Sequence, residues 1–171
     1  MKIAVLTISD RSAQGEREDL SGPRIQEMVL QRGWEVVTAE VIADEQGEIE
    51  TLLSSWSDSG EVDLILTTGG TGFSARDRTP EATRKVVEKL APGLVEAMRA
   101  WSMSKNPHAM LSRAAAGIRK RTLIVNLPGS PKAVEENLAV IIPALPHAIK
   151  LLQEDPDAEK GHHLQPPDRQ A

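Results

Sequence analysis

An apolar run in the middle of the chain ends in small and polar residues whose types suit phosphate binding. Three glycines among three threonines follow the run from Val62 to Leu66, and Asp77 comes five residues after the last glycine. Glycines at the end of a strand let backbone N–H groups approach a bound anion, because no Cβ stands in the way. The alternative is a glycine-rich turn without a ligand. The candidate ligand-binding residues of this segment are Thr68, Gly69, Gly70, Thr71 and Gly72.

A second junction of the same character lies further along the chain. A short predicted strand at 122–126 is followed by a Leu-Pro-Gly-Ser-Pro turn, in which Ser130 suits a helix cap and Pro131 suits the first helical position. A helix N-terminus carries free N–H donors and partial positive charge. Two such junctions side by side suit a ligand with more than one phosphate. Pro128, Gly129 and Ser130 are therefore further candidate ligand-binding residues.

Two carboxylates could hold a metal ion beside these phosphates. Asp77 follows the glycine segment, and Asp44 follows a predicted strand at 34–42. A carboxylate beside bound phosphates is repelled unless a cation lies between them, and Mg²⁺ binds through one or two carboxylates plus substrate phosphates. Each residue also has a simpler interpretation. Asp77 could be a turn aspartate that bonds its own backbone, and Asp44 could be the N-cap of a helix.

The end of the first predicted strand supplies a third group of candidates, Ser9, Asp10 and Arg11. Arg11 could bind a phosphate or form a surface ion pair, and the sequence does not decide between the two. Three more basic residues could add positive charge to the site or could be solvated, namely Arg76, Arg99 and Lys132.

The elements that must position these residues alternate along the chain, and their order predicts an α/β fold. Apolar strands separated by capped helices form a three-layer α/β/α sandwich with a mostly parallel sheet, in which ligands bind at the carboxyl ends of strands. One domain is expected over residues 1–153, and the polar residues 154–171 are expected to form a disordered tail. Predicted helices begin at Ser21, Asp44, Thr79, Pro92, Ser130 and Pro143, and predicted strands span 2–9, 34–42, 62–68, 114–120 and 122–126.

Composition narrows the class of protein. The chain of 171 residues has no cysteine, which excludes disulfides and thiolate chemistry, and no run of apolar residues long enough to span a membrane. Its net charge of -5 and its single Phe and three Trp argue against a nucleic-acid partner. The first apolar run reaches an acidic residue at position 10, which is unlike a signal peptide. The sequence thus predicts a cytoplasmic protein without nucleic-acid or membrane partners.

Eight segments in order make the chain similar to the molybdopterin adenylyltransferase family, of the MogA and MoaB type, which is shared by the gephyrin G domain. The glycine segment, the Asp-x-Thr-Pro segment and the Asn-Leu-Pro-Gly turn are the most specific combination, and the similarity extends over residues 2 to 152. The matching segments are 7–12, 42–45, 67–72, 76–83, 92–93, 98–99, 111–113 and 126–132.

The resemblance implies a reaction in which molybdopterin and Mg-ATP give adenylylated molybdopterin and pyrophosphate, a step of molybdenum cofactor biosynthesis. It implies that Asp44 and Asp77 are the essential acids, and that both junctions hold the phosphates of the pterin and the nucleotide. A homotrimer is implied, with hexamers in the MoaB branch, and so is hand-over to a protein that inserts molybdate. One antiparallel strand is also implied, which residues 114–120 could supply.

The chemistry of the residues agrees with this reaction. The attacking phosphate oxygen is already ionised at neutral pH, so positioning, amide donors and Mg²⁺ matter more than a general base. The alternatives are a carrier of the same fold that binds molybdopterin without turnover and a scaffold like gephyrin. The presence of both aspartates favours the enzyme. Molybdenum or tungsten, the MogA or the MoaB branch, and which junction binds which substrate stay open at this point.

Overall fold

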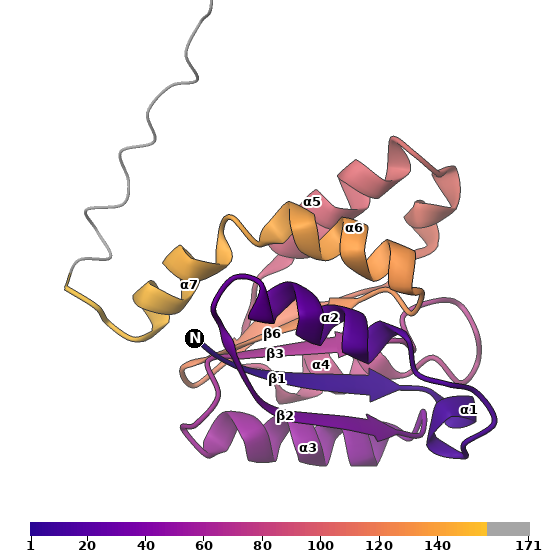
Figure 1. Ribbon diagram of the computed structural model, residues 1–171, viewed down its shortest axis with the longest axis horizontal. Helices are drawn as coiled ribbons and strands as arrows, with labels where there is room; N and C mark the ends of the chain where they lie inside the picture. Colours follow the sequence, from indigo (N-terminus) through magenta and orange to yellow (C-terminus); the bar gives the residue numbers. More distant parts are fainter. Residues whose placement is uncertain (157–171) are drawn as a thin grey trace, which may run out of the picture.

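The computed structural model describes residues 1–156, which form a central sheet with helices on both faces (Figure 1). The predicted three-layer α/β/α fold is confirmed. The strands are β1 (Lys2–Ile8), β2 (Glu35–Ile42), β3 (Leu64–Thr68), β4 (Lys89–Leu90), β5 (Ala116–Arg119) and β6 (Thr122–Leu127). The helices are α1 (Asp10–Ala13), α2 (Ser21–Leu30), α3 (Gln46–Asp58), α4 (Thr79–Val86), α5 (Pro92–Met103), the 3₁₀ helix η1 (Pro107–Leu111), α6 (Pro131–Ile141) and α7 (Leu145–Leu152).

The order of the strands brings the two junctions that are candidates for phosphate binding together. The sheet runs β2-β1-β3-β6-β5-β4, with the first four strands parallel. β5 pairs antiparallel with both β6 and β4, so among the described strands it runs against the rest. The carboxyl ends of β1, β2, β3 and β6 therefore share one edge, on the side where α1 lies in Figure 1. β4, which the sequence did not predict, is an exposed two-residue strand without an apolar pattern.

Successive buried residues of the central strands point to opposite faces of the sheet, and each face has its own core. Ile3, Val5, Leu64 and Leu66 pack with α2, α5, α6 and α7, whereas Ile65 and its neighbours on that face pack with α3 and α4. Figure 1 shows α2 and α6 over one face and α3 under the other. A strand covered on both faces is apolar without a break, which is why β3 and β6 were recognisable as buried strands.

Several helix starts differ from their predicted caps. Ser130 is the N-cap of α6, as predicted, and its hydroxyl accepts a hydrogen bond from Ala133 N–H. Ser21 is a helical residue and not a cap, because the N–H groups of Ser21 and Gly22 both donate to Asp19 Oδ1 at 3.0 Å. The sequence pattern missed this aspartate because it lies two residues before the helix begins.

The predicted caps at Asp44 and Thr79 are wrong for a reason that concerns the site. The residue that precedes α3 is Glu45, and the Asp44 carboxylate instead accepts from Asp10 N–H at 2.9 Å. Thr79 lies inside α4, and its hydroxyl donates to the Gly69 carbonyl at 2.9 Å. Both side chains are thus used to join loops at the sheet edge.

The last described helix, α7, ends at Leu152, and the described residues end at 156. Residues 157–171, most of the predicted disordered tail, lie outside the described residues. None of the helices within residues 1–156 is long and apolar enough to cross a membrane.

Candidate active site

The loop after β6 is held against the end of β3 and the start of α2 by hydrogen bonds from side-chain hydroxyls to its backbone carbonyls. The Thr68 hydroxyl donates to the Pro128 carbonyl at 2.6 Å, and the Ser21 hydroxyl donates to the Gly129 carbonyl at 2.8 Å. A Cβ on Gly129 would lie only 3.3 Å from the Gly69 Cα. The two junctions therefore form one continuous surface at the end of the sheet.

Glycine is required where this surface is tightest. Gly69 has a φ of +95°, and a Cβ on it would lie 2.1 Å from the Ile8 carbonyl oxygen at the end of β1. Gly70 has a φ of +60°, and its Cβ would meet the Thr79 hydroxyl at 2.4 Å. The chain can thus turn out of β3 against two neighbouring elements only because these positions carry no side chain.

Gly69→Ala is therefore expected to destabilise the fold by more than about 3 kcal/mol, since the strain of a positive φ adds to a clash with backbone that has little freedom to move. Gly33→Ala is the matched control, because Gly33 has a φ of +73° and nothing within 4 Å of its Cβ position. The control should lose only about 1–2 kcal/mol. Urea unfolding of both variants measures the difference, and equal losses would contradict the close approach to Ile8.

A polar cavity of about 210 Å³ opens at this surface. It lies where β1, β2, β3 and β6 end, next to the start of α2. Asp19 and Arg17, which the sequence did not single out, also line it. Of the predicted site residues, the cavity is lined by Ser9, Asp44, Thr68, Gly69, Gly70, Asp77 and Gly129.

Asp44 and Asp10 bind each other's backbone across the ends of β1 and β2. The Asp44 carboxylate accepts from Asp10 N–H at 2.9 Å, and the Asp10 carboxylate accepts from Asp44 N–H at 3.0 Å. Asp10 also receives two hydrogen bonds from Arg76, at 2.9 and 2.8 Å, and Arg76 pairs with Glu45 at 2.8 Å. Asp10 is therefore engaged with loops and not with the cavity, and the charge of Arg76 is matched by two carboxylates.

The pKa values of Asp10 and Asp44 are shifted in opposite directions. Hydrogen bonds from Arg76 lower the pKa of Asp10. Burial raises the pKa of Asp44, and the charges of Asp10 and Asp77 raise it further, although the hydrogen bond from Asp10 N–H and the charge of Arg76 oppose the shift. A bound cation would relieve this repulsion between Asp44 and Asp77.

The loop after β3, residues 69–77, is called the glycine loop, and the donor set beside it fits Mg²⁺. A Cβ on Gly70 would lie 2.9 Å from Asp44 Oδ1, and a Cβ on Gly72 would lie 2.9 Å from Asp77 Oδ2, so both carboxylates lie against the loop. Within residues 1–156 no group of three or more His, Cys, Asp or Glu residues could hold a metal ion. Two carboxylates with the remaining positions filled by phosphate and water is the coordination that Mg²⁺ favours.

Asp77 also has the turn role that the sequence allowed as an alternative. Its Oδ2 accepts from Ser74 N–H at 2.8 Å, and its own N–H donates to the Ser74 carbonyl at 3.0 Å. This turn gives the carboxylate a fixed direction while it lines the polar cavity. The two interpretations of Asp77 are therefore compatible.

The remaining predicted residues lie elsewhere. Arg11 is exposed and lines neither cavity at the site, and Ser130 is occupied as the cap of α6. Lys132 is exposed beside Trp101 in a separate groove between α5 and α6. Thr71, Gly72 and Pro128 contribute to a second cavity.

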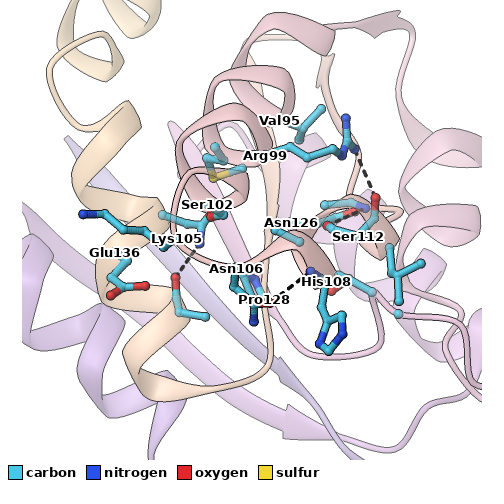
Figure 2. Close-up of a pocket in the computed structure, with 18 residues that line it drawn as sticks. Val95, Arg99, Ser102, Lys105, Asn106, His108, Ser112, Asn126, Pro128 and Glu136 are labelled. Atoms are coloured by element: carbon cyan, nitrogen blue, oxygen red, sulfur yellow. Dashed lines mark hydrogen bonds between the residues drawn. The ribbon is translucent and has the colours of Figure 1, made fainter.

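This second, mostly apolar cavity has a volume of about 330 Å³ and lies between α5, η1, α6 and the end of β6 (Figure 2). Arg99 reaches to the Ser112 carbonyl at 3.2 Å on one side, and Lys105 and Glu136 lie on the other. This cavity was not predicted from the sequence, because η1 has no periodic pattern. Polar residues clustered at the end of α5 were the available signal.

Asn126 connects this cavity to the core and was not predicted as a site residue. It is fully buried, and its Nδ2 donates to the hydroxyls of Thr67 at 3.0 Å and Thr83 at 2.8 Å. Its Oδ1 accepts from Ala115 N–H at 3.0 Å. Asn126 on β6 therefore links β3, α4 and the residue before β5 in one buried network.

Comparisons with known proteins identify the family of the chain. Residues 4–147 match the family described as "Probable molybdopterin binding domain". The chain is 46% identical over 152 residues to the molybdopterin adenylyltransferase of Helicobacter pylori, covering 88% of this chain and 86% of that protein. It is 42% identical to the molybdopterin adenylyltransferase of Escherichia coli, covering 81% and 72%. Its fold is similar to the molybdopterin biosynthesis enzyme MoaB of Thermus thermophilus, with a TM-score of 0.85, 46% identity and coverage of 91% and 98%. The chain belongs to the molybdopterin adenylyltransferase family, of the MogA and MoaB type.

Proposed function

We propose that the chain transfers the adenylyl group of ATP to molybdopterin. The phosphate oxygen of molybdopterin attacks the α-phosphorus of ATP, the bond from that phosphorus to the bridging oxygen breaks, and pyrophosphate leaves with the bonding electrons. The observation that carries the proposal is the placement of Asp44 and Asp77 in one polar cavity with glycines of the loops after β3 and β6.

Each group of residues has a task in this reaction. The backbone N–H groups of the loops after β3 and β6 would bind phosphate oxygens, because they lie at helix N-termini and at glycines. Asp44 and Asp77 would hold Mg²⁺, which neutralises charge on the phosphates and the leaving pyrophosphate. The apolar cavity of about 330 Å³ is large enough for a flat heterocycle, so one of the two substrates would place its ring there.

The curated relatives support the reaction class. Proteins from Helicobacter pylori and Escherichia coli that are 46% and 42% identical are named molybdopterin adenylyltransferases. Assembly as a homotrimer and hand-over of the product to a molybdate-insertion protein are part of the same proposal. The carrier function is its alternative.

Release of pyrophosphate from Mg-ATP, with and without molybdopterin, tests the proposal. We expect release that depends on molybdopterin and stops when EDTA removes the metal. Tight binding of molybdopterin without any release of pyrophosphate would assign the chain to the carrier function instead. Release at the same rate without molybdopterin would show hydrolysis of ATP and would contradict adenylyl transfer.

A further inference from the structure

Arg113, on the segment between η1 and β5, makes an unusual set of contacts with the glycine loop. Its Nε donates to the Gly72 carbonyl at 2.6 Å, and its Nη2 donates to the Asp77 carbonyl at 2.8 Å. These carbonyls lie at the two ends of the segment 72–77. One planar guanidinium therefore fixes the distance between the start and the end of this segment.

Arg113 is itself held in place on three sides. Its Nη1 forms an ion pair with Glu81 on α4, and its backbone N–H donates to the Thr71 carbonyl at 2.9 Å. Its own carbonyl accepts from Arg84 at 3.1 Å. The guanidinium is thus fixed to α4 and to the glycine loop before any ligand binds.

The position of the Asp77 carboxylate depends on the same two ends. A Cβ on Gly72 would lie 2.9 Å from Asp77 Oδ2, so the carboxylate lies directly against the residue whose carbonyl Arg113 holds. Arg113 lines neither the polar nor the apolar cavity. Its guanidinium reaches the site through the backbone carbonyls of Gly72 and Asp77.

We infer that Arg113 is a positioning residue that sets the place of the Asp77 carboxylate for metal binding. The inference rests on the proposed function and adds to it a residue that acts through Asp77. It requires the shape of the guanidinium and not merely its charge, because a lysine has no planar fork to reach two carbonyls and Glu81 together.

Arg113→Lys tests this, because it keeps the charge and removes the fork. We expect kcat to fall about 10–100-fold and the Mg²⁺ concentration for half-maximal rate to rise, as for other residues that orient metal ligands. KM for molybdopterin should stay nearly unchanged. Arg119→Lys is the matched control, because Arg119 also donates to a carbonyl, that of Val86, and pairs with Asp58, but lies away from the loop. An equal effect of both substitutions would overturn the inference.

A double substitution separates positioning from an independent role. If Arg113 acts through Asp77, then Arg113→Lys combined with Asp77→Asn should be no slower than Asp77→Asn alone. Losses that multiply would overturn the inference, and so would full activity of Arg113→Lys.

Hydrogen exchange of the free protein gives a readout that needs no turnover. The amides of residues 72–77 should exchange faster in Arg113→Lys than in wild type, while those of β1 and β3 stay protected. Unchanged exchange in the loop would overturn the positioning role. Absence of pyrophosphate release in wild type would instead overturn the proposed function, so the two failures are distinguishable.

Discussion

Asp77→Asn is expected to reduce the rate of adenylyl transfer by about 10³-fold or more, because loss of one anionic ligand weakens a metal contact that contributes several kcal/mol in the transition state. The substitution is informative because the Asn side-chain oxygen can still accept from Ser74 N–H, as Asp77 Oδ2 does at 2.8 Å. The turn is kept and only the charge is removed. The measurement is pyrophosphate release from Mg-ATP and molybdopterin.

The two interpretations of Asp77 predict opposite results for this variant. If the residue only stabilised its turn, Asp77→Asn would be active and Asp77→Ala would be impaired. If the carboxylate holds the metal, both variants lose activity. Asp63→Asn is the matched control, because Asp63 also accepts a backbone hydrogen bond, from Lys2 N–H at 2.7 Å, at the opposite end of the sheet. Wild-type rates are expected for this control.

Asp44→Asn is expected to reduce the rate of adenylyl transfer by a similar factor, about 10³-fold. The same substitution should make the fold more stable at neutral pH. Burial and the nearby charges of Asp10 and Asp77 raise the pKa of Asp44, so its ionised form is unfavourable in the folded protein. The amide removes that charge and can still accept from Asp10 N–H. Thermal unfolding with parallel rate measurements tests both effects.

The sign of the pH dependence follows from the same pKa. Because the pKa of Asp44 is raised on folding, wild type loses stability relative to Asp44→Asn as the pH rises from the ordinary aspartate pKa through the raised one. The gain in Tm should therefore be present at pH 7 and vanish at low pH. Protons compete with Mg²⁺ for this carboxylate, so the Mg²⁺ requirement of wild type should rise as the pH falls through the same range.

Asp58→Asn is a control for which the expected change in Tm at neutral pH has the opposite sign. Hydrogen bonds from Arg119 lower the pKa of Asp58 to about 2, so its charge stabilises the fold above the ordinary aspartate pKa. This variant should lose Tm at neutral pH and keep its activity. An Asp44→Asn protein that loses Tm at pH 7 would contradict the burial and repulsion described for that carboxylate.

The fold could be predicted from the sequence because its strands are covered on both faces. Runs such as Leu64–Thr68 and Thr122–Leu127 are fully buried, and each is followed by glycine or proline. The same signal predicted which loops lie at the sheet edge. β4 and η1 could not be predicted in this way, since one is two exposed residues and the other is a short 3₁₀ helix without periodicity.

Residues of the candidate site could be predicted from the sequence where few residue types can meet the structural requirement. Gly69 and Gly70 have positive φ, and Asp44 and Asp77 line the polar cavity with them. The roles of Asp10, Arg76 and Arg113 depend on which loops meet in space. Arg113 and Gly72 are 41 residues apart in sequence, and no local pattern links them.

The placement of β6 has a consequence for how a growing chain reaches its active form. Leu64 in β3 pairs with Leu123 in β6, and β6 lies between β3 and β5. A ribosome-bound chain that stops before β6 already contains both aspartates and the glycine loop, yet β3 still presents an open parallel edge. Long-range pairing of this kind forms slowly, and open strand edges promote aggregation. The nascent chain therefore acquires its catalytic surface and its protection against misassembly in the same late event, the entry of β6 into the sheet.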